Sequence, residues 1–356
     1  MFQLDQAKAL SECGHKVVFA AIDVRSIRKW RHWGLVEREY NGLPVMEFNF
    51  PMGPILPKLR TRLSEIGFSL ILQRVIAKFG KPDIIHVHFG VTASIIVKAC
   101  KRERISYVVT EHSSGINQDN LTEVEIAPYC YAYQNAAAVI AVSSALAKHI
   151  FRYSGIMATV VPNIIDFSIF SCCAIRHREF RFISAGHLIT SKGFDVLLYA
   201  FRQVVNRGVT ARLMIMGDGP ERGHLEEIIK ELGLQEQVDL FGSYTRTQFS
   251  KELARSDAFV LASRTETFGV VYAEAMACGL PVIATRCGGP EDFVNERNGI
   301  LVAVDDVTEL AEAMFQMRVN RAYDTFEIKS FANNQFSARA VSCRIEKIFM
   351  NVISQK

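Results

Sequence analysis

The sequence predicts an α/β protein built from two doubly wound domains, each with a mostly parallel sheet covered by helices on both faces. Three observations lead to this prediction. The chain has 356 residues, which is more than one hydrophobic core usually supports. Short apolar runs alternate with helix-length amphipathic runs along most of it, as is typical of parallel sheets. A polar, turn-rich break near Pro162–His177 divides this alternation into two halves.

The break predicts an N-terminal domain at residues 1–167 and a C-terminal domain at residues 168–335. Ligands of doubly wound sheets lie at the carboxyl ends of the strands, so we expect the two domains to face each other across a ligand-binding cleft. Residues 336–356 contain the pattern of a helix with one apolar face, which Ser337 can cap. We expect this helix to pack back on the N-terminal domain.

The front half is expected to contain five parallel strands. Before them, Phe2–Glu12 has the pattern of an amphipathic helix. A doubly wound domain usually opens with a strand and a glycine-rich turn before such a helix. We therefore expect that this first strand is missing from the sequence, which would leave a sheet edge open. The five expected strands are Lys16–Ala21, Asp83–His88, Tyr107–Thr110, Ala138–Val142 and Thr159–Val161.

The rear half repeats the alternation more regularly. Its expected helices are Phe194–Val205, Gly223–Leu232 and Val270–Cys278. Its expected strands are Arg181–Ala185, Arg212–Met216, Val238–Phe241, Ala258–Leu261, Pro281–Ala284 and Ile300–Val304.

Composition excludes several classes of protein. A hydrophobic content of 49% and a charged content of 22% fit a globular chain. No apolar run is long enough to span a bilayer, and the polar start has no secretory pattern. The eight cysteines form no Cys-x-x-Cys pair, so we expect reduced thiols in a cytoplasmic protein.

The net charge of +4 is unevenly distributed, with +6 in residues 1–165 and −2 in the remainder. A basic front half indicates an anionic partner or surface, with ordinary solvated faces as the alternative. The run from Ile55 to Leu63, continuing to Arg74 and Lys78, is basic and amphipathic. It could rest on an anionic membrane as a peripheral contact, or be an ordinary surface helix pair. No aromatic residues are set among a basic stripe, which argues against nucleic acid.

The densest chemical signal lies in Ser263–Leu301. A helix is expected to begin near Gly269 and to end at Gly279. Its first amides, around Gly269 and Val270, have no partners within the helix and suit a phosphate. A glycine at this position lets the phosphate approach the backbone closely.

Two glutamates flank this expected phosphate site. Glu274 lies one turn inside the helix, on the same face as Val270, where its carboxylate can accept two hydroxyl hydrogen bonds from a ribose. Glu266 precedes the helix, on the side where a transferred sugar would lie. The spacing alone is common in proteins, but the strand–turn–helix context favours opposite ends of one bound nucleotide sugar.

A second signal follows the strand that ends near Ser184. There, Lys192 stands before a helix and could reach the same phosphates from a neighbouring strand end. Its ammonium would offset charge on a leaving diphosphate. The alternative is a solvated lysine at a helix start.

These residues resemble the retaining glycosyltransferases of the GT-B fold, often called family 4, whose two domains are Rossmann-like. The likeness covers nearly the whole chain and is closest in Phe182–Val304. The rear motifs are Met216-Gly-Asp-Gly219-Pro, Val238-Asp-Leu-Phe-Gly242 and the two glutamates with seven residues between them. The looser front motifs are Gln6-Ala-Lys-Ala-Leu, Gly14-His15-Lys-Val, Pro82-Asp-Ile-Ile-His86 and Val142-Ser143.

The resemblance implies a hexosyl transferase that moves a sugar from a nucleoside diphosphate onto a glycan or lipid-linked acceptor with retention, as in polysaccharide synthesis. It implies diphosphate binding by Lys192 and by the amides of Phe268, Gly269 and Val270, ribose binding by Glu274, and donor-sugar contacts by Glu266 and His112. Where the family usually has arginine for phosphate, this chain has His187, which is only partly charged near neutral pH and is kept as a weaker donor-binding candidate.

No metal or other cofactor is expected. The chain has no Asp-x-Asp pair, which another glycosyltransferase architecture uses to hold a divalent ion. Lys192 and the helix start at Gly269 would supply the positive field instead. His86, His88 and His112 are a minor alternative as metal ligands.

Three other functions remain as alternatives. One is a non-catalytic nucleotide-sugar binder, a truncated homologue crippled by its missing start. Another is a nucleotide-sugar epimerase with a similar fold. A dehydrogenase is disfavoured because Gly223 falls one place late for Gly-x-Gly-x-x-Gly.

Overall fold

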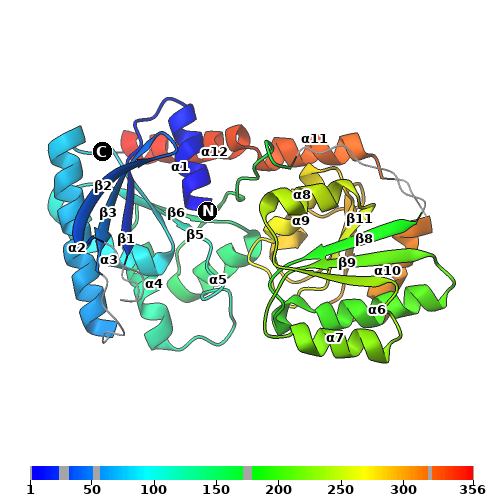
Figure 1. Cartoon of the computed structure of the whole chain (residues 1–356). Helices are drawn as coiled ribbons and strands as arrows, with labels where there is room; N and C mark the ends of the chain where they lie inside the picture. The colour runs from blue at the N-terminus through cyan, green and yellow to red at the C-terminus, as the bar shows by residue number, and fades with distance from the viewer. Residues whose placement is uncertain (1, 24–31, 51–56, 171–178, 320–322, 356) are drawn as a thin grey trace. The chain divides into compact units, whose positions relative to one another are not determined.

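The computed structural model describes residues 2–23, 32–50, 57–170, 179–319 and 323–355 (Figure 1). The chain divides into two compact units. Unit 1 comprises Met1–Val161 and Val341–Lys356, and unit 2 comprises Pro162–Ala340. The division falls within the turn-rich segment that separates the two halves of the sequence.

Unit 2 contains a six-stranded, all-parallel sheet with the strand order β10-β9-β8-β11-β12-β13. In chain order this is 3-2-1-4-5-6, the order of a doubly wound nucleotide-binding sheet. The prediction of a Rossmann-like rear half is therefore confirmed. The strands are β8 (Phe180–Ala185), β9 (Ala211–Met216), β10 (Val238–Gly242), β11 (Ala258–Leu261), β12 (Val282–Thr285) and β13 (Gly299–Val302).

Helices cover both faces of this sheet. In Figure 1, α8 and α9 lie on one face, and α6, α7 and α10 lie on the other. Because both faces are covered, side chains such as Phe182, Leu213 and Ile283 are fully buried. The helices are α6 (Phe194–Asn206), α7 (Arg222–Glu231), α8 (Arg246–Ala254), α9 (Val270–Ala277), α10 (Val307–Val319) and α11 (Thr325–Phe336).

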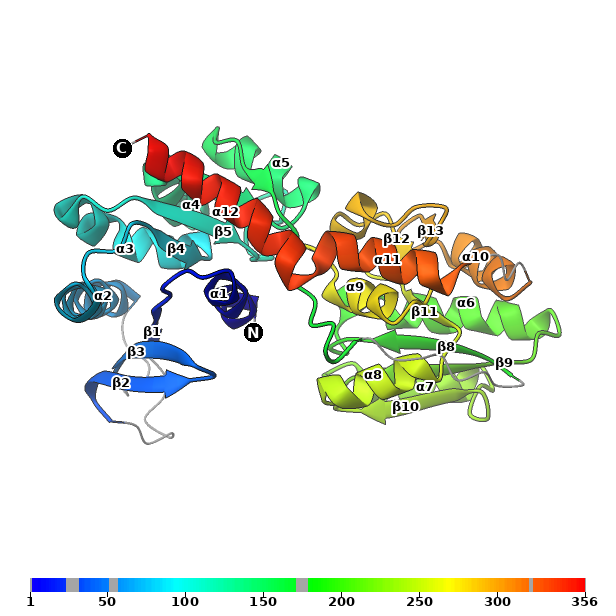
Figure 2. The ribbon, with the colours of Figure 1, turned by 90° about the horizontal axis from the view of Figure 1, so that it is seen from above.

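Unit 1 has two sheets in the residues described, and Figure 2 shows them as separate. One is a parallel sheet with the order β4-β5-β6-β7, formed by Ile85–His88, Tyr107–Glu111, Ala138–Ala141 and Thr159–Val160. The other has the order β1-β3-β2, with β1 (Phe19–Asp23) parallel and β2 (Gly34–Tyr40) antiparallel to β3 (Leu43–Asn49). The β2–β3 hairpin was not predicted from the sequence. Its signal was Asn41-Gly42, a turn with positive φ at both residues.

Six helices complete the described part of unit 1. They are α1 (Phe2–Glu12), α2 (Pro57–Phe79), α3 (Gly90–Glu103), α4 (Glu123–Asn135), α5 (Ser144–Ser154) and α12 (Ala338–Ser354). None of the helices in the described ranges is long and apolar enough to cross a membrane. Ile55 and Leu56, at the start of the basic amphipathic run, lie outside the described residues. The remainder of that run forms α2.

The C-terminal helix α12 packs on unit 1 (Figures 1 and 2). Ser337 caps its start by accepting a hydrogen bond from the amide of Ala340 at 3.3 Å. Further along, His15 Nε2 lies 2.7 Å from Glu346 Oε1, and the Phe349 ring meets His86 edge-on at 5.3 Å between centroids. These contacts join the last helix to the first helix–strand connection and to β4.

Candidate functional site

Polar side chains gather where β8 and β11 end in unit 2. In this strand order the connections leave β8 and β11 in opposite directions, and doubly wound sheets bind their ligands beyond the carboxyl ends of such strands. The β8–α6 loop carries His187 and Lys192, and the β11–α9 loop carries Glu266. Residues from two distant sequence segments are thereby brought to one sheet edge.

Lys192 and Glu266 are in direct contact. Lys192 Nζ lies 2.6 Å from Glu266 Oε1, and the Ser263 hydroxyl donates to the same oxygen at 2.8 Å. Their side chains are 22% and 9% exposed, so the pair is partly shielded from water while the ammonium stays within reach of a ligand. An anion that entered beside Lys192 could replace Glu266 as the partner of the ammonium.

Two glycines let the loops approach closely enough to make this site. A Cβ on Gly193 would lie 2.0 Å from the carbonyl oxygen of Ala262, at the end of β11. A Cβ on Gly289 would lie 2.4 Å from the Cα of Phe268. Because neither position can accept a side chain without moving backbone, both loops are held against β11 and the start of α9.

The start of α9 has the features expected of an anion site. Gly269 occupies the N-cap position with φ of 85°, and no side chain of the described residues caps it by a hydrogen bond. A helix N-terminus presents backbone N–H groups and the positive end of the helix dipole. Phe268 and Val270 flank this glycine, and the Phe268 ring packs against Phe293 at 5.3 Å.

Glu274 lies one turn inside α9 and is 7% exposed. Its Oε1 accepts from Arg246 Nη2 at 3.4 Å, and the Arg246 guanidinium stacks 5.3 Å from the Phe170 ring centroid. Burial, with the charge of Glu274, raises the pKa of Tyr244 to about 12. The two glutamates therefore have separate cationic partners. Arg246 was not identified from the sequence, where its signal was a basic residue directly after the capping residue Thr245.

His187 is exposed and bonded to the next loop. Its Nδ1 lies 2.5 Å from the carbonyl oxygen of Asp218. Since a carbonyl only accepts, Nδ1 carries the proton, and Nε2 is the ring nitrogen that can contact a ligand. His187 thus lies in the same β8–α6 loop as Lys192.

In unit 1, the rings of two histidines of β4 and of His112, directly after β5, lie in contact, with His88 stacked on His112. His88 Nδ1 lies 3.0 Å from His112 Nε2, and His86 Nε2 lies 2.7 Å from the Thr110 hydroxyl. Burial and the neighbouring histidine lower the pKa of His86 to about 3, and burial also lowers the pKa of His88. His86 and His88 are therefore uncharged at neutral pH. Within the described ranges, no group of three or more His, Cys, Asp or Glu is arranged to hold a metal ion.

Glu111 holds the chain around His112. Its carboxylate accepts from the amides of His112 and Ser113 at 2.9 and 2.8 Å, and from Gly90 N and the Tyr133 hydroxyl at 2.7 and 2.6 Å. Burial raises the pKa of this carboxyl, and the four donors oppose that shift. The buried acid thus joins the start of α3 to the loop that carries His112.

Family models match both halves of the chain. The model for glycosyltransferase family 4 matches residues 3–168, and the model for glycosyl transferases group 1 matches residues 172–322. Among curated relatives, N-acetyl-alpha-D-glucosaminyl L-malate synthase of Bacillus anthracis is 30% identical over 66% of this chain and 65% of its own length. A human phosphatidylinositol N-acetylglucosaminyltransferase subunit is 26% identical over 80% of this chain and 60% of its own length. The matched segments thus span less than two thirds of these relatives.

Solved structures show the same fold. Sucrose-phosphate synthase from Thermosynechococcus elongatus superposes with a TM-score of 0.81 at 20% identity, covering 99% of this chain and 92% of that chain. Anabaena HepE, solved in complex with UDP and glucose, superposes with a TM-score of 0.69 at 20% identity, covering 87% and 86%. With one family model on each half and this structural likeness, the chain belongs to the group 1 glycosyltransferases of the GT-B fold.

Proposed function

We propose that the protein is a hexosyl transferase that moves a sugar from a nucleoside diphosphate to an acceptor hydroxyl. The observation that carries the proposal is the Lys192–Glu266 contact of 2.6 Å at the crevice of the doubly wound unit 2, beside the glycine-capped start of α9. An ammonium and free helix amides match a diphosphate, and a carboxylate matches sugar hydroxyls. Complexes of HepE with UDP are in keeping with such a donor.

We assign the donor's parts to separate groups. Lys192 and the amides near Phe268–Val270 bind the diphosphate, with His187 Nε2 as an additional contact. Glu274 binds the ribose. Glu266 and His112 contact the transferred sugar. The bond from the anomeric carbon to the diphosphate breaks, a bond to the acceptor oxygen forms, and the acceptor's proton passes to the departing diphosphate. The family resemblance favours retention of configuration.

The developing negative charge on the diphosphate is met by protein groups. Lys192 Nζ contributes a full charge, and the start of α9 contributes a partial one, about half an elementary charge. We therefore propose that turnover needs no divalent metal. Turnover in excess EDTA should match turnover in magnesium, whereas loss in EDTA and recovery with Mg²⁺ or Mn²⁺ would contradict this.

The acceptor is proposed to be a glycan or a lipid-linked hydroxyl at the cytoplasmic face of a membrane. Names of relatives point to N-acetylglucosamine as the first sugar to test and phosphatidylinositol as one lipid acceptor to test. Part of the basic run on α2 is already neutralised, because Arg74 and Lys78 both pair with Glu37, at 2.5 and 2.7 Å. Surface attraction would therefore rest on other basic residues of unit 1, such as Arg60 and Arg62, which are exposed.

A panel of nucleoside diphosphate sugars, screened by thermal shift and then by release of UDP, GDP or ADP, tests the proposal. We expect the nucleoside diphosphate sugars of one base to raise the melting temperature of the protein. We also expect release of the corresponding nucleoside diphosphate only when an acceptor is present. Stabilisation without release or hydrolysis would instead indicate a non-catalytic binder, and an altered sugar still joined to the nucleotide would indicate an epimerase. Flotation with anionic vesicles at low salt tests the membrane contact, which absence of binding would exclude.

A further inference from the structure

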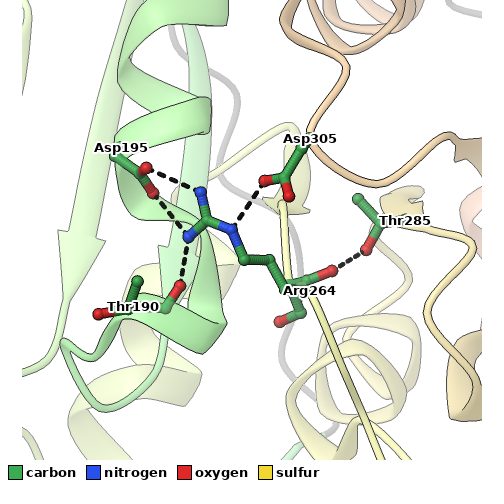
Figure 3. A network of polar contacts seen from close by, with 6 residues as sticks. Thr190, Asp195, Arg264, Thr285 and Asp305 are labelled. Carbon is green, nitrogen blue, oxygen red and sulfur yellow. Dashed lines mark hydrogen bonds and ion pairs between the residues drawn. The ribbon is translucent and has the colours of Figure 1, made fainter.

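One arginine links the β11–α9 loop to the β8–α6 segment and to the β13–α10 connection. Arg264 lies in the β11–α9 loop, between Ser263 and Glu266. Figure 3 shows its guanidinium extending away from that loop toward Asp195 on α6 and toward Asp305 in the β13–α10 connection. The proposed chemistry gives this residue no direct role.

The contacts of Arg264 are numerous and directional. Nη1 and Nη2 lie 3.1 and 2.8 Å from the two oxygens of Asp195, a two-pronged pairing that fixes the guanidinium plane. Nε lies 2.7 Å from Asp305 Oδ1. Although burial raises the pKa of Asp195, the hydrogen bond and charge of Arg264 hold it below its ordinary value.

The same arginine holds the chain next to Lys192 on both sides. Its backbone amide donates to the carbonyl of Ser191 at 2.8 Å, and Nη1 donates to the carbonyl of Thr190. Asp195 follows Lys192 by three residues, so the clamp contacts the segment before and after the lysine. Arg264 therefore fixes the backbone on both sides of Lys192.

Charge balance argues that Arg264 does not bind the diphosphate itself. Its single positive charge faces two carboxylates, Asp195 and Asp305, so a phosphate would have to compete with both. Lys192 faces one carboxylate, Glu266.

We propose that Arg264 is a positioning residue that sets the distance between Lys192 and Glu266. It holds the β8–α6 loop against the β11–α9 loop without touching the donor. The link to donor binding rests on the proposed function, whereas the link to the position of Lys192 is a property of the fold alone.

Arg207 offers a matched control at the other end of α6, the helix that carries Asp195. Arg207, at the end of α6, pairs with Glu312 of α10 at 2.6 Å and stacks on the Phe315 ring at 5.1 Å. Arg264 and Arg207 thus each join α6 to α10 or to the loop before it, at opposite ends of α6. Arg264→Met should reduce thermal stability more than Arg207→Met, because Arg264 faces two carboxylates and Arg207 faces one. Arg264→Lys should keep part of the Asp195 pairing.

The test measures the accessibility of Lys192 and UDP binding in the full chain. Amine labelling quantified by mass spectrometry should rise about fivefold or more at Lys192 in Arg264→Met, less in Arg264→Lys, and not at all in Arg207→Met. UDP should bind about tenfold more weakly to Arg264→Met than to the wild type, with Arg207→Met within twofold. Unchanged labelling of Lys192 in Arg264→Met would overturn the proposal. So would an equal loss of UDP affinity in Arg264→Met and Arg207→Met. Raised labelling in a protein whose wild type binds no UDP, GDP or ADP would support the positioning role and contradict the proposed function.

Discussion

The two units place different chemistry at the carboxyl ends of their parallel strands. In unit 2 the groups are charged, with Lys192 against Glu266 and Arg246 against Glu274. In unit 1 they are imidazoles, with His86, His88 and His112 stacked between β4 and β5. Desolvation lowers the pKa of His86 and His88, whereas Lys192 and Arg246 each face a carboxylate.

Under the proposed function, this difference would give the two units separate tasks. A diphosphate needs fixed positive charge, which unit 2 supplies. Hydroxyl groups need neutral donors and acceptors, which an uncharged imidazole supplies without repelling or attracting the leaving diphosphate. Under the proposed function, unit 2 would determine donor affinity, and unit 1 would act on the sugar and acceptor.

The largest expected effect comes from removing the charged pair. Lys192→Met or Glu266→Gln should lower kcat/KM by about 10²–10³-fold, because each group acts on charge or sugar in the transition state. Lys192→Met should also abolish the thermal shift with UDP, while His112→Asn in unit 1 should retain it. Lys230→Met, an exposed position on α7, is the control. If Lys192→Met bound UDP with the same affinity as the wild type, the claim that unit 2 determines donor affinity through Lys192 would be wrong.

A smaller effect is expected from filling the loop contact. Gly193→Ala introduces a Cβ 2.0 Å from the Ala262 carbonyl, and should destabilise unit 2 by about 2–4 kcal/mol through the clash and the positive φ together. Gly208 lies after the other end of α6 and also has a positive φ, but a Cβ added there by Gly208→Ala would meet open space. This substitution should cost only about 1 kcal/mol. Urea unfolding measures both, and equal losses would show that the close approach does not matter.

The half-buried histidines of β4 predict acid sensitivity in unit 1. The folded pKa of His86 lies near 3, below its ordinary value of 6.5. The unfolded chain therefore binds this proton first as the pH falls, and stability present above pH 6.5 is lost toward pH 3. Between pH 6.5 and 5 the loss attributable to His86 should be about 2 kcal/mol, and His88, whose pKa is also lowered, should add to it. Urea unfolding at several pH values gives the free energy of unfolding as a function of pH. Its slope should be shallower for His86→Phe than for the wild type, whereas His224→Asn, at an exposed position in unit 2, should match the wild type.

The smallest expected effect is that of a chelator. EDTA should change kcat by less than twofold, because the charged groups of unit 2 take the place of a divalent ion in the proposed chemistry. A chelator effect that is reversed by zinc and absent in His88→Phe would instead place a metal at the histidine stack of unit 1.

Much of unit 2 could be predicted from its sequence because its signals are local. Apolar runs identified all six strands, and Gly279 marked the end of α9, where it adopts a φ of 84°. The sequence predicted that Lys192 lies at a strand end next to the Glu266 loop, because both residues lie in loops after parallel strands, but their direct contact was not predicted. In unit 1, the hairpin of β2 and β3 was not predicted, although Asn41-Gly42 is a typical hairpin turn.

The side-chain network could not be predicted in the same way. Arg264 and Asp195 are 69 positions apart in sequence, and their pairing depends on the courses of two loops that no periodicity encodes. The same holds for Arg246 and Glu274, 28 positions apart. A long side chain at a loop position has many possible partners, and packing of the loops selects one of them.

The most direct test of the division between the units is a crystal structure of the protein with UDP. The account predicts the diphosphate against Lys192 Nζ and the amides at the start of α9, with the ribose hydroxyls on Glu274. A diphosphate bound instead among His86, His88 and His112, or one that leaves the Lys192–Glu266 contact undisturbed, would contradict it.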